Sequence, residues 1–203
     1  DKVEKSISTH LQAAIHMVEQ GADGGLANFI SNKIDNSQEF KEWRKKMPSI
    51  IPDNISKYQK SYPKCELDKV DSEIKNIGYL PQEEQYFFHG GFILKDGLLG
   101  FKTSKPLSTT LCPQVALREA EHLGKAYDQG ELHLYVLKVV DPRTKVYVFK
   151  QGGTNLGHEK EVLFGAGASL NIVRKTFITD YNVNKYGCDS KKIPAYVVEV
   201  TIS

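Results

Sequence analysis

The sequence predicts an α+β fold whose first part is helical and whose second part is rich in strands. Over residues 1–80, apolar side chains recur at the three- and four-residue spacing of amphipathic helices. From Gln85 onward, short β-branched and aromatic runs alternate with glycine and proline turns. No linker-like segment separates the two parts. We therefore expect a single domain over 1–203, with an N-terminal helical layer (1–80) and a mostly antiparallel, strand-rich core with one inserted helix (81–203).

Helical spacing is clear at four places in the first part. Gly24 and Gly25 interrupt the pattern after the first helix, and Pro48 stops the third. Pro52 and Pro63 punctuate the segment before the last helix, and no element is assigned there. The helices are expected at Ile7–Val18, Leu26–Ile34, Phe40–Met47 and residues 66–77.

Strand signals dominate the second part, with one helix inserted between Pro113 and Leu123. The alternation at Leu132–Val136 is that of a half-buried strand, and Gln151–Asn155 has the composition of a loop. The strands are expected at Tyr86–Phe88, Leu107–Leu111, Leu132–Val136, Val146–Phe149, Glu161–Phe164, Leu170–Ile172 and Tyr196–Ile202, with a hairpin segment through Phe92, Leu94, Leu98 and Phe101.

Composition and residue spacing argue against several classes of function. The 27 basic and 25 acidic residues leave a net charge of +2, which is too balanced for a nucleic-acid-binding surface. No apolar run approaches the roughly 18 residues of a membrane span, and the first residues lack the apolar stretch of a signal peptide. Cys65, Cys112 and Cys188 are odd in number and far apart, which favours reduced thiols. No CxxC or HExxH spacing predicts a metal site.

Three short clusters in the strand-rich part contain residue types that carry chemistry: His89-Gly90, Ser108-Thr109-Thr110 and Glu159-Lys160-Glu161. Each also has an ordinary structural explanation. Histidine occurs at strand ends, serine and threonine suit strands, glycines after strands mark turns, and alternating charges suit a solvated strand edge.

The third cluster is the most informative. Residues i and i+2 of a strand share a face, so Glu159 and Glu161 would project together with Lys160 opposite. The apolar run Val162–Phe164 indicates that this strand is buried. Two carboxylates on one buried face repel each other unless a cationic substrate or a hydrogen-bond network compensates them.

The order of these clusters resembles the ADP-ribosyltransferase superfamily, in particular its bacterial toxin and effector branch with an Arg, Ser-Thr-Ser and Glu-x-Glu signature. The match spans residues 85–175 and is most specific at Glu159–Ile172. His89 stands where this branch has Arg, and Thr110 where it often has Ser. His followed by Gly is typical of the diphtheria-toxin and poly-ADP-ribose-polymerase branch, which has Tyr at the position of Ser108. The resemblance implies a mostly antiparallel split β-sandwich with an N-terminal helical layer beside an NAD cleft.

The resemblance also implies a reaction, in which NAD+ is the co-substrate and ADP-ribose passes to a protein side chain without a metal. The expected catalytic residues are Glu161, Ser108, which would orient Glu161 by a hydrogen bond, and Glu159, which would face the acceptor. The NAD contacts are expected from His89, which would donate to the ribose or a phosphate, from the Gly90 backbone, and from Ser108, Thr109 and Thr110. The loop 151–158 would contact the target protein through Gly153, Thr154, Asn155 and His158.

The acceptor stays open between two types. Glu-x-Glu usually goes with arginine acceptors, and some bacterial effectors of this superfamily modify other side chains, including threonine on ubiquitin. The expected partner is a host protein, with ubiquitin one candidate, and the chain is expected to be a monomeric secreted toxin or effector that acts in a host cytosol, with no nucleic-acid or membrane partner. Two alternatives remain, an NAD glycohydrolase in which water replaces the acceptor, and a catalytically inactive ADP-ribosyltransferase fold that serves as a binding module.

Overall fold

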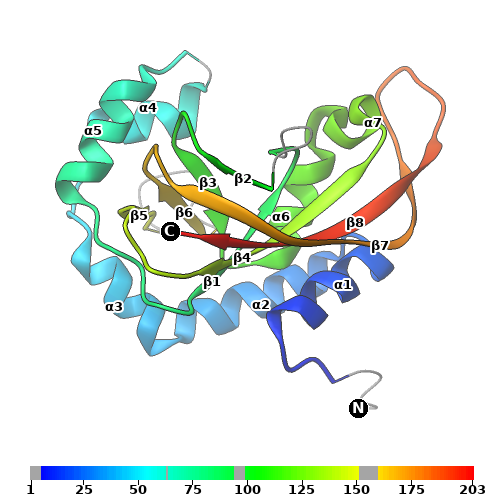
Figure 1. The fold of residues 1–203 in the computed structure, drawn as a ribbon, viewed down its shortest axis with the longest axis horizontal. Coiled ribbons are helices and arrows are strands. Elements are labelled where there is room, and N and C mark those ends of the chain that lie inside the picture. The colour runs from blue at the N-terminus through cyan, green and yellow to red at the C-terminus, as the bar shows by residue number, and fades with distance from the viewer. Residues whose placement is uncertain (1–5, 63, 94–98, 151–159) are drawn as a thin grey trace.

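The computed structural model describes residues 6–62, 64–93, 99–150 and 160–203, and within them it has the predicted α+β architecture (Figure 1). Five helices precede the first strand, and two more lie between β3 and β4. Among the helices in these ranges, none is long and apolar enough to cross a membrane. The helices are α1 His10–Gln20, α2 Gly24–Asn36, α3 Gln38–Lys46, α4 Asp53–Ser61, α5 Leu67–Ile77, α6 Pro113–Glu121 and α7 Lys125–Gln129, with a 3-10 turn at His122–Gly124.

The helix boundaries follow from capping residues. Thr9 accepts a hydrogen bond from the Gln12 backbone at 3.1 Å and begins α1, and Gly21 with φ of 80° ends it. Asp23 accepts from the Leu26 backbone at 2.9 Å and begins α2. The two glycines expected to interrupt the helical pattern are therefore the first two residues of α2, because the cap at Asp23 fixes its start.

The segment between Pro52 and Pro63, left without an element by the sequence reasoning, contains helix α4. Pro52 occupies the N-cap position, where its missing N–H costs nothing. The helix buries Ile55 completely and is fixed to α5, because the Glu73 carboxylate accepts from the Asn54 and Ile55 backbone amides at 3.2 and 2.9 Å. Pro52 is thus the boundary signal at the start of a short helix.

The strands form one sheet in the order β2-β7-β8-β4-β1-β3-β6-β5. Neighbours are antiparallel except for the parallel pair β4 and β8. The expected hairpin segment ending at Phe101 gives a strand that pairs with β7, while residues 94–98 lie outside the described ranges. The strands are β1 Tyr86–Gly90, β2 Gly100–Lys102, β3 Leu107–Thr110, β4 Leu132–Val139, β5 Val146–Val148, β6 Glu161–Phe164, β7 Ser169–Val183 and β8 Lys191–Ile202.

Strand β4 is buried on both faces, which corrects the expectation of a half-buried strand. Leu134 and Val136 pack into a core with α1 and α6, whereas Tyr135 and Leu137 on the opposite face pack into a core with α3, α4 and α5. In Figure 1 the sheet accordingly lies between helices on both sides. The alternation of apolar and part-polar residues in β4 therefore arises because its two faces pack into two different cores.

Strand β7 is much longer than the expected Leu170–Ile172, extending to Val183. Its middle, from Val173 to Phe177, is exposed and carries Arg174 and Lys175, so apolar periodicity is absent there. Pairing with β8 along almost the whole length, with two register shifts, maintains this extended ribbon. Local hydrophobicity could not reveal a strand that is fixed by its neighbour.

The sheet is held together loosely at its centre, where β1 and β3 share a single registered pair, Phe88 opposite Thr110. Strands β3, β6 and β5 are therefore joined to the other five strands at this one registered pair, as expected of a split sheet. This junction brings the end of β1, the strand β3 and the start of β6 together. The described residues of the three chemistry-bearing clusters lie in or next to these segments.

Candidate active site

Ser108 and Glu161 are in hydrogen-bond contact across the pair β3 and β6. Thr110 lies opposite Glu161, so Ser108, two residues earlier, shares that face and lies on the diagonal. The Ser108 hydroxyl donates to Glu161 Oε1 at 2.6 Å, a short distance that is typical of bonds to a carboxylate. Glu161 is 7% exposed. The hydrogen bond expected between these two residues is present.

Helix α4 supplies a second neighbour of Glu161. Gln59 Nε2 lies 3.4 Å from Glu161 Oε2 and donates to it. The adjacent Tyr58 is close enough that burial, together with the negative charge of Glu161, raises the pKa of its phenol. The sequence reasoning missed both residues because it assigned no element there, although Ile55, Tyr58 and Tyr62 recur at helical spacing.

His89 is hydrogen-bonded to the backbone of the same serine. Its Nδ1 lies 2.7 Å from the Ser108 carbonyl oxygen, and burial lowers the pKa of the imidazole. The ring is therefore neutral near pH 7, and because a carbonyl only accepts, Nδ1 carries the proton. Nε2 is then a hydrogen-bond acceptor. The expected donation by His89 to the ribose or a phosphate stays a prediction, and from Nε2 it requires a second proton on the ring.

Gly90 is required to be a glycine by the packing of helix α6. A Cβ at this position would lie 1.6 Å from the Ala116 carbonyl oxygen and 2.7 Å from the Ala120 nitrogen. Helix α6 thus packs directly on the strand backbone. The close approach of α6 therefore explains the glycine. The expected contact of the Gly90 backbone with NAD stays a prediction.

The two threonine hydroxyls of the Ser-Thr-Thr segment also have protein partners. Thr109 is 3% exposed and its hydroxyl donates to the Val162 carbonyl at 2.6 Å, which joins β3 to β6 from the opposite face. Thr110 Oγ1 accepts from the Cys112 backbone at 3.1 Å, at the start of α6. Thr109 therefore has a structural explanation, while Thr110 lies directly opposite Glu161.

The backbone at Lys160 differs from the expected strand. Its φ is 52°, in the left-handed region, and β6 begins only at Glu161. Strand alternation therefore does not extend from Glu161 to Glu159, and the argument that placed both carboxylates on one face fails at Lys160. Glu159 itself lies outside the described residues, as do the loop positions Gly153, Thr154, Asn155 and His158.

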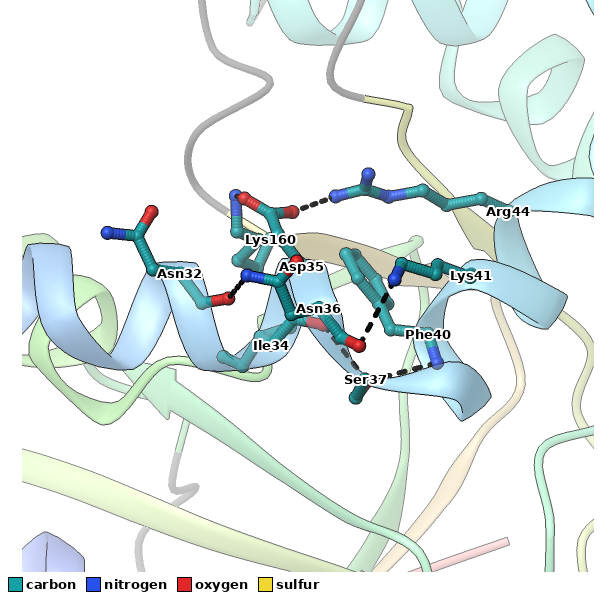
Figure 2. Close-up of polar contacts among 9 residues, drawn as sticks. All are labelled: Asn32, Ile34, Asp35, Asn36, Ser37, Phe40, Lys41, Arg44 and Lys160. Carbon is teal, nitrogen blue, oxygen red and sulfur yellow. Dashed lines mark hydrogen bonds and ion pairs between the residues drawn. The ribbon is translucent and has the colours of Figure 1, made fainter.

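Lys160 points away from solvent toward the helical layer. Its side chain is fully buried, and Nζ lies 2.9 Å from Asp35 Oδ2 at the end of α2 (Figure 2). The other oxygen of Asp35 pairs with Arg44 of α3. The sequence reasoning placed Lys160 opposite the glutamates but did not find its partner, because the pair joins residues 125 positions apart along the chain (160 minus 35).

Comparison with known proteins gives a likeness in structure alone. No protein-family model matches the sequence, and no curated protein matches it. Among solved structures, the ADP-ribosylating toxin BECa of a Clostridium perfringens binary enterotoxin, solved with NADH, matches with a TM-score of 0.50 and 13% identity, over 90% of this chain and 49% of that one. The C2-I component of the Clostridium botulinum C2 toxin has a TM-score of 0.41 and 10% identity over 93% and 46% of the two chains. Vis toxin, an ADP-ribosyltransferase from Vibrio splendidus, matches with a TM-score of 0.38 and 13% identity, over 98% of this chain and 88% of that one.

The match to BECa defines the class of the fold. The likeness to BECa shows that the chain has the fold of ADP-ribosylating toxins, with the expected α+β architecture. The chain spans about half the length of the first two toxins. The ligands and targets of those toxins are properties of those proteins and are not assigned to this chain by the likeness in fold.

Proposed function

We propose that this chain is a mono-ADP-ribosyltransferase, which cleaves NAD+ between nicotinamide and ribose and transfers ADP-ribose to a protein. The observation that carries the proposal is the 2.6 Å hydrogen bond between Ser108 and Glu161 at the junction of the split sheet. A nearly buried carboxylate, held by a neighbouring hydroxyl in this fold, is an arrangement suited to stabilising a cation.

The chemistry of the proposed reaction explains why a fixed carboxylate suffices. Nicotinamide leaves as a neutral ring from a cationic one, so its departure needs no general acid. Positive charge grows on the ribose, in a state akin to the oxocarbenium ion of glycoside hydrolysis. Glu161 stabilises this charge, and Ser108 keeps the carboxylate in one orientation, so that little reorganisation is needed when the charge develops.

The residues around this pair suggest how the substrate is held. The neutral His89 presents Nε2 as an acceptor, which suits a ribose hydroxyl. Thr110 lies opposite Glu161 and is the other hydroxyl on the same face. Gln59 donates to the second oxygen of Glu161, so a ribose hydroxyl that approaches this oxygen shares it with the Gln59 amide or displaces that amide.

The acceptor side chain belongs to the part of the proposal that involves residues 151–159. Glu159 is proposed to position the incoming nucleophile, and Gly153, Thr154, Asn155 and His158 to contact the target. Arginine and a hydroxyl, such as a threonine of ubiquitin, both remain acceptors in this proposal. Mass spectrometry of a modified target separates them, and lability to hydroxylamine favours arginine.

The place of action is proposed to be a host cytosol, as for a secreted toxin. Cys65, Cys112 and Cys188 are all free thiols, a state that a reducing compartment preserves. Burial raises the pKa of the Cys112 thiol, which keeps it protonated and unreactive.

A labelling experiment tests the proposed function. The chain and its Glu161→Gln variant are incubated with NAD+ labelled on the ADP-ribose part and a host-cell lysate. We expect protein-bound label with the parent chain and none with the variant. Label that is released as free ADP-ribose would favour the glycohydrolase, and absence of both cleavage and NAD+ binding by calorimetry would favour the inactive binding module.

A further inference from the structure

A buried ion pair connects the strand that carries Glu161 to the helical layer. The Lys160 side chain is 0% exposed and its Nζ lies 2.9 Å from Asp35 Oδ2. Asp35, at 18% exposure, also pairs with Arg44, and Figure 2 shows its carboxylate beside both cations. A buried ammonium is costly unless an anion compensates it. Asp35 therefore determines where the Lys160 side chain can lie.

The backbone of Lys160 is held as firmly as its side chain. Its φ of 52° is a conformation that a residue with a Cβ rarely adopts and keeps only where its surroundings fix it. The Lys160 carbonyl accepts from the Leu111 amide at 3.3 Å, and the Glu161 carbonyl accepts from the Phe149 amide at 3.1 Å. The turn at Lys160 thus sets the register in which β6 begins.

From this geometry we infer that Asp35 is a positioning residue for Glu161. Through its ion pair with Lys160, Asp35 fixes the direction in which the chain enters β6, and with it the position of the Glu161 carboxylate relative to Ser108. The catalytic meaning of this inference rests on the proposed function, in which Glu161 stabilises the ribose cation. Its structural content is independent of that function.

Asp71 offers a matched control at the other end of β6. This carboxylate is 14% exposed, belongs to α5, pairs with Lys75, and accepts from the Ala166 amide at 2.7 Å just after the strand. It therefore has similar burial and charge, and it too joins a helix of the N-terminal layer to the sheet. Asp35 holds the end of β6 that carries Glu161, whereas Asp71 holds the opposite end. A loss of fold stability is therefore expected from either variant, but a displacement of Glu161 only from a variant of Asp35.

The kinetic test compares Asp35→Asn, Lys160→Met, the double variant of both, and Asp71→Asn, each confirmed as folded by circular dichroism. We expect kcat for NAD+ cleavage to fall about 10- to 100-fold in the first three, with KM for NAD+ within about twofold, because a small displacement of a catalytic group reduces turnover more than binding. Asp35→Glu, which keeps the carboxylate, should recover part of the loss. A wild-type kcat in Asp35→Asn, or an equal loss in Asp71→Asn, would overturn the inference.

A second measurement needs no enzymatic activity. Amide hydrogen exchange should speed up at Leu111 and Phe149 in Asp35→Asn and at Ala166 in Asp71→Asn, since each variant loosens one end of β6. If the parent chain does not cleave NAD+, the proposed function fails, and this pattern alone decides the inference. Unchanged exchange at Leu111 and Phe149 in Asp35→Asn would overturn it.

Discussion

The imidazole of His89 and the hydroxyl-bearing residue Ser108 are joined by a 2.7 Å hydrogen bond from Nδ1 to the Ser108 carbonyl oxygen. The same serine donates its hydroxyl to Glu161 at 2.6 Å. Ser108 of β3 thus fixes the His89 imidazole of β1 through its carbonyl and the Glu161 carboxylate of β6 through its hydroxyl. The geometry of the candidate site depends on this central strand.

Loss of the Ser108 hydroxyl should impair catalysis and spare the fold. Ser108→Ala keeps the carbonyl that holds His89 and removes only the donor to Glu161 Oε1. We expect kcat for nicotinamide release to fall about 10- to 100-fold, as for the loss of one oriented hydrogen bond at a developing charge. Thr109→Val is the companion variant, with a stability loss of about 1 kcal/mol and an unchanged kcat. A larger loss of kcat in Thr109→Val than in Ser108→Ala would contradict the assignment.

Removal of the Gln59 amide should have a smaller effect than removal of the Ser108 hydroxyl. The Gln59 contact with Glu161 Oε2 is 3.4 Å long, against 2.6 Å for Ser108, so it restrains the carboxylate more weakly. We expect Gln59→Ala to lower kcat by less than about tenfold. Steady-state kinetics of the two variants side by side check this order, and the reverse order would show that α4 holds the carboxylate.

Acidification should destabilise the protein below about pH 6.5, the ordinary pKa of histidine. Burial lowers the pKa of His89 and of His133 in the folded state, so the unfolded chain binds more protons as the pH falls. The free energy of unfolding therefore decreases from the ordinary pKa down through the lowered folded values. Urea titrations between pH 8 and pH 5 measure this slope. His89→Asn, which keeps a donor for the Ser108 carbonyl, should flatten it, and an equal slope in this variant would contradict the lowered pKa of His89.

A side chain at Gly90 should disrupt the packing of α6 on β1. The added methyl group of Gly90→Ala would lie 1.6 Å from the Ala116 carbonyl oxygen, so helix and strand must separate. We expect a loss of about 3 kcal/mol or more in the free energy of unfolding. Gly24→Ala is the control, because a Cβ there meets only the end of the Arg118 side chain at 3.7 Å. This variant should gain about 0.4–1 kcal/mol by restricting the unfolded chain.

Much of the fold follows from local signals in the sequence. The helices around Ala14, Trp43 and Ile74 bury an apolar stripe, and capping residues mark several of their ends. The strand at Glu161–Phe164 and the helix that begins at Pro113 were also expected where they are found. Local periodicity is sufficient where one face of an element meets one core.

The remainder depends on contacts between distant segments. The second half of β7 is a strand because β8 pairs with it, and β4 is buried on both faces because two helical groups pack against it. The Lys160 side chain is buried against Asp35, and the tautomer of His89 is set by the Ser108 carbonyl. The resemblance of the motifs to the ADP-ribosyltransferase superfamily indicated Ser108 and Glu161, whereas Gln59 and Asp35 emerged only in three dimensions.

The most direct test of the central claim is the rate of nicotinamide release from NAD+ by the parent chain and by Glu161→Gln. Glutamine preserves the shape of the side chain and can still bond Ser108, so the two proteins should unfold at similar urea concentrations. The account predicts that the parent cleaves NAD+ and that the variant is slower by about 100-fold or more, because the charge that stabilises the ribose cation is gone. Equal rates of release from both proteins would contradict the assignment of Glu161 as the catalytic carboxylate.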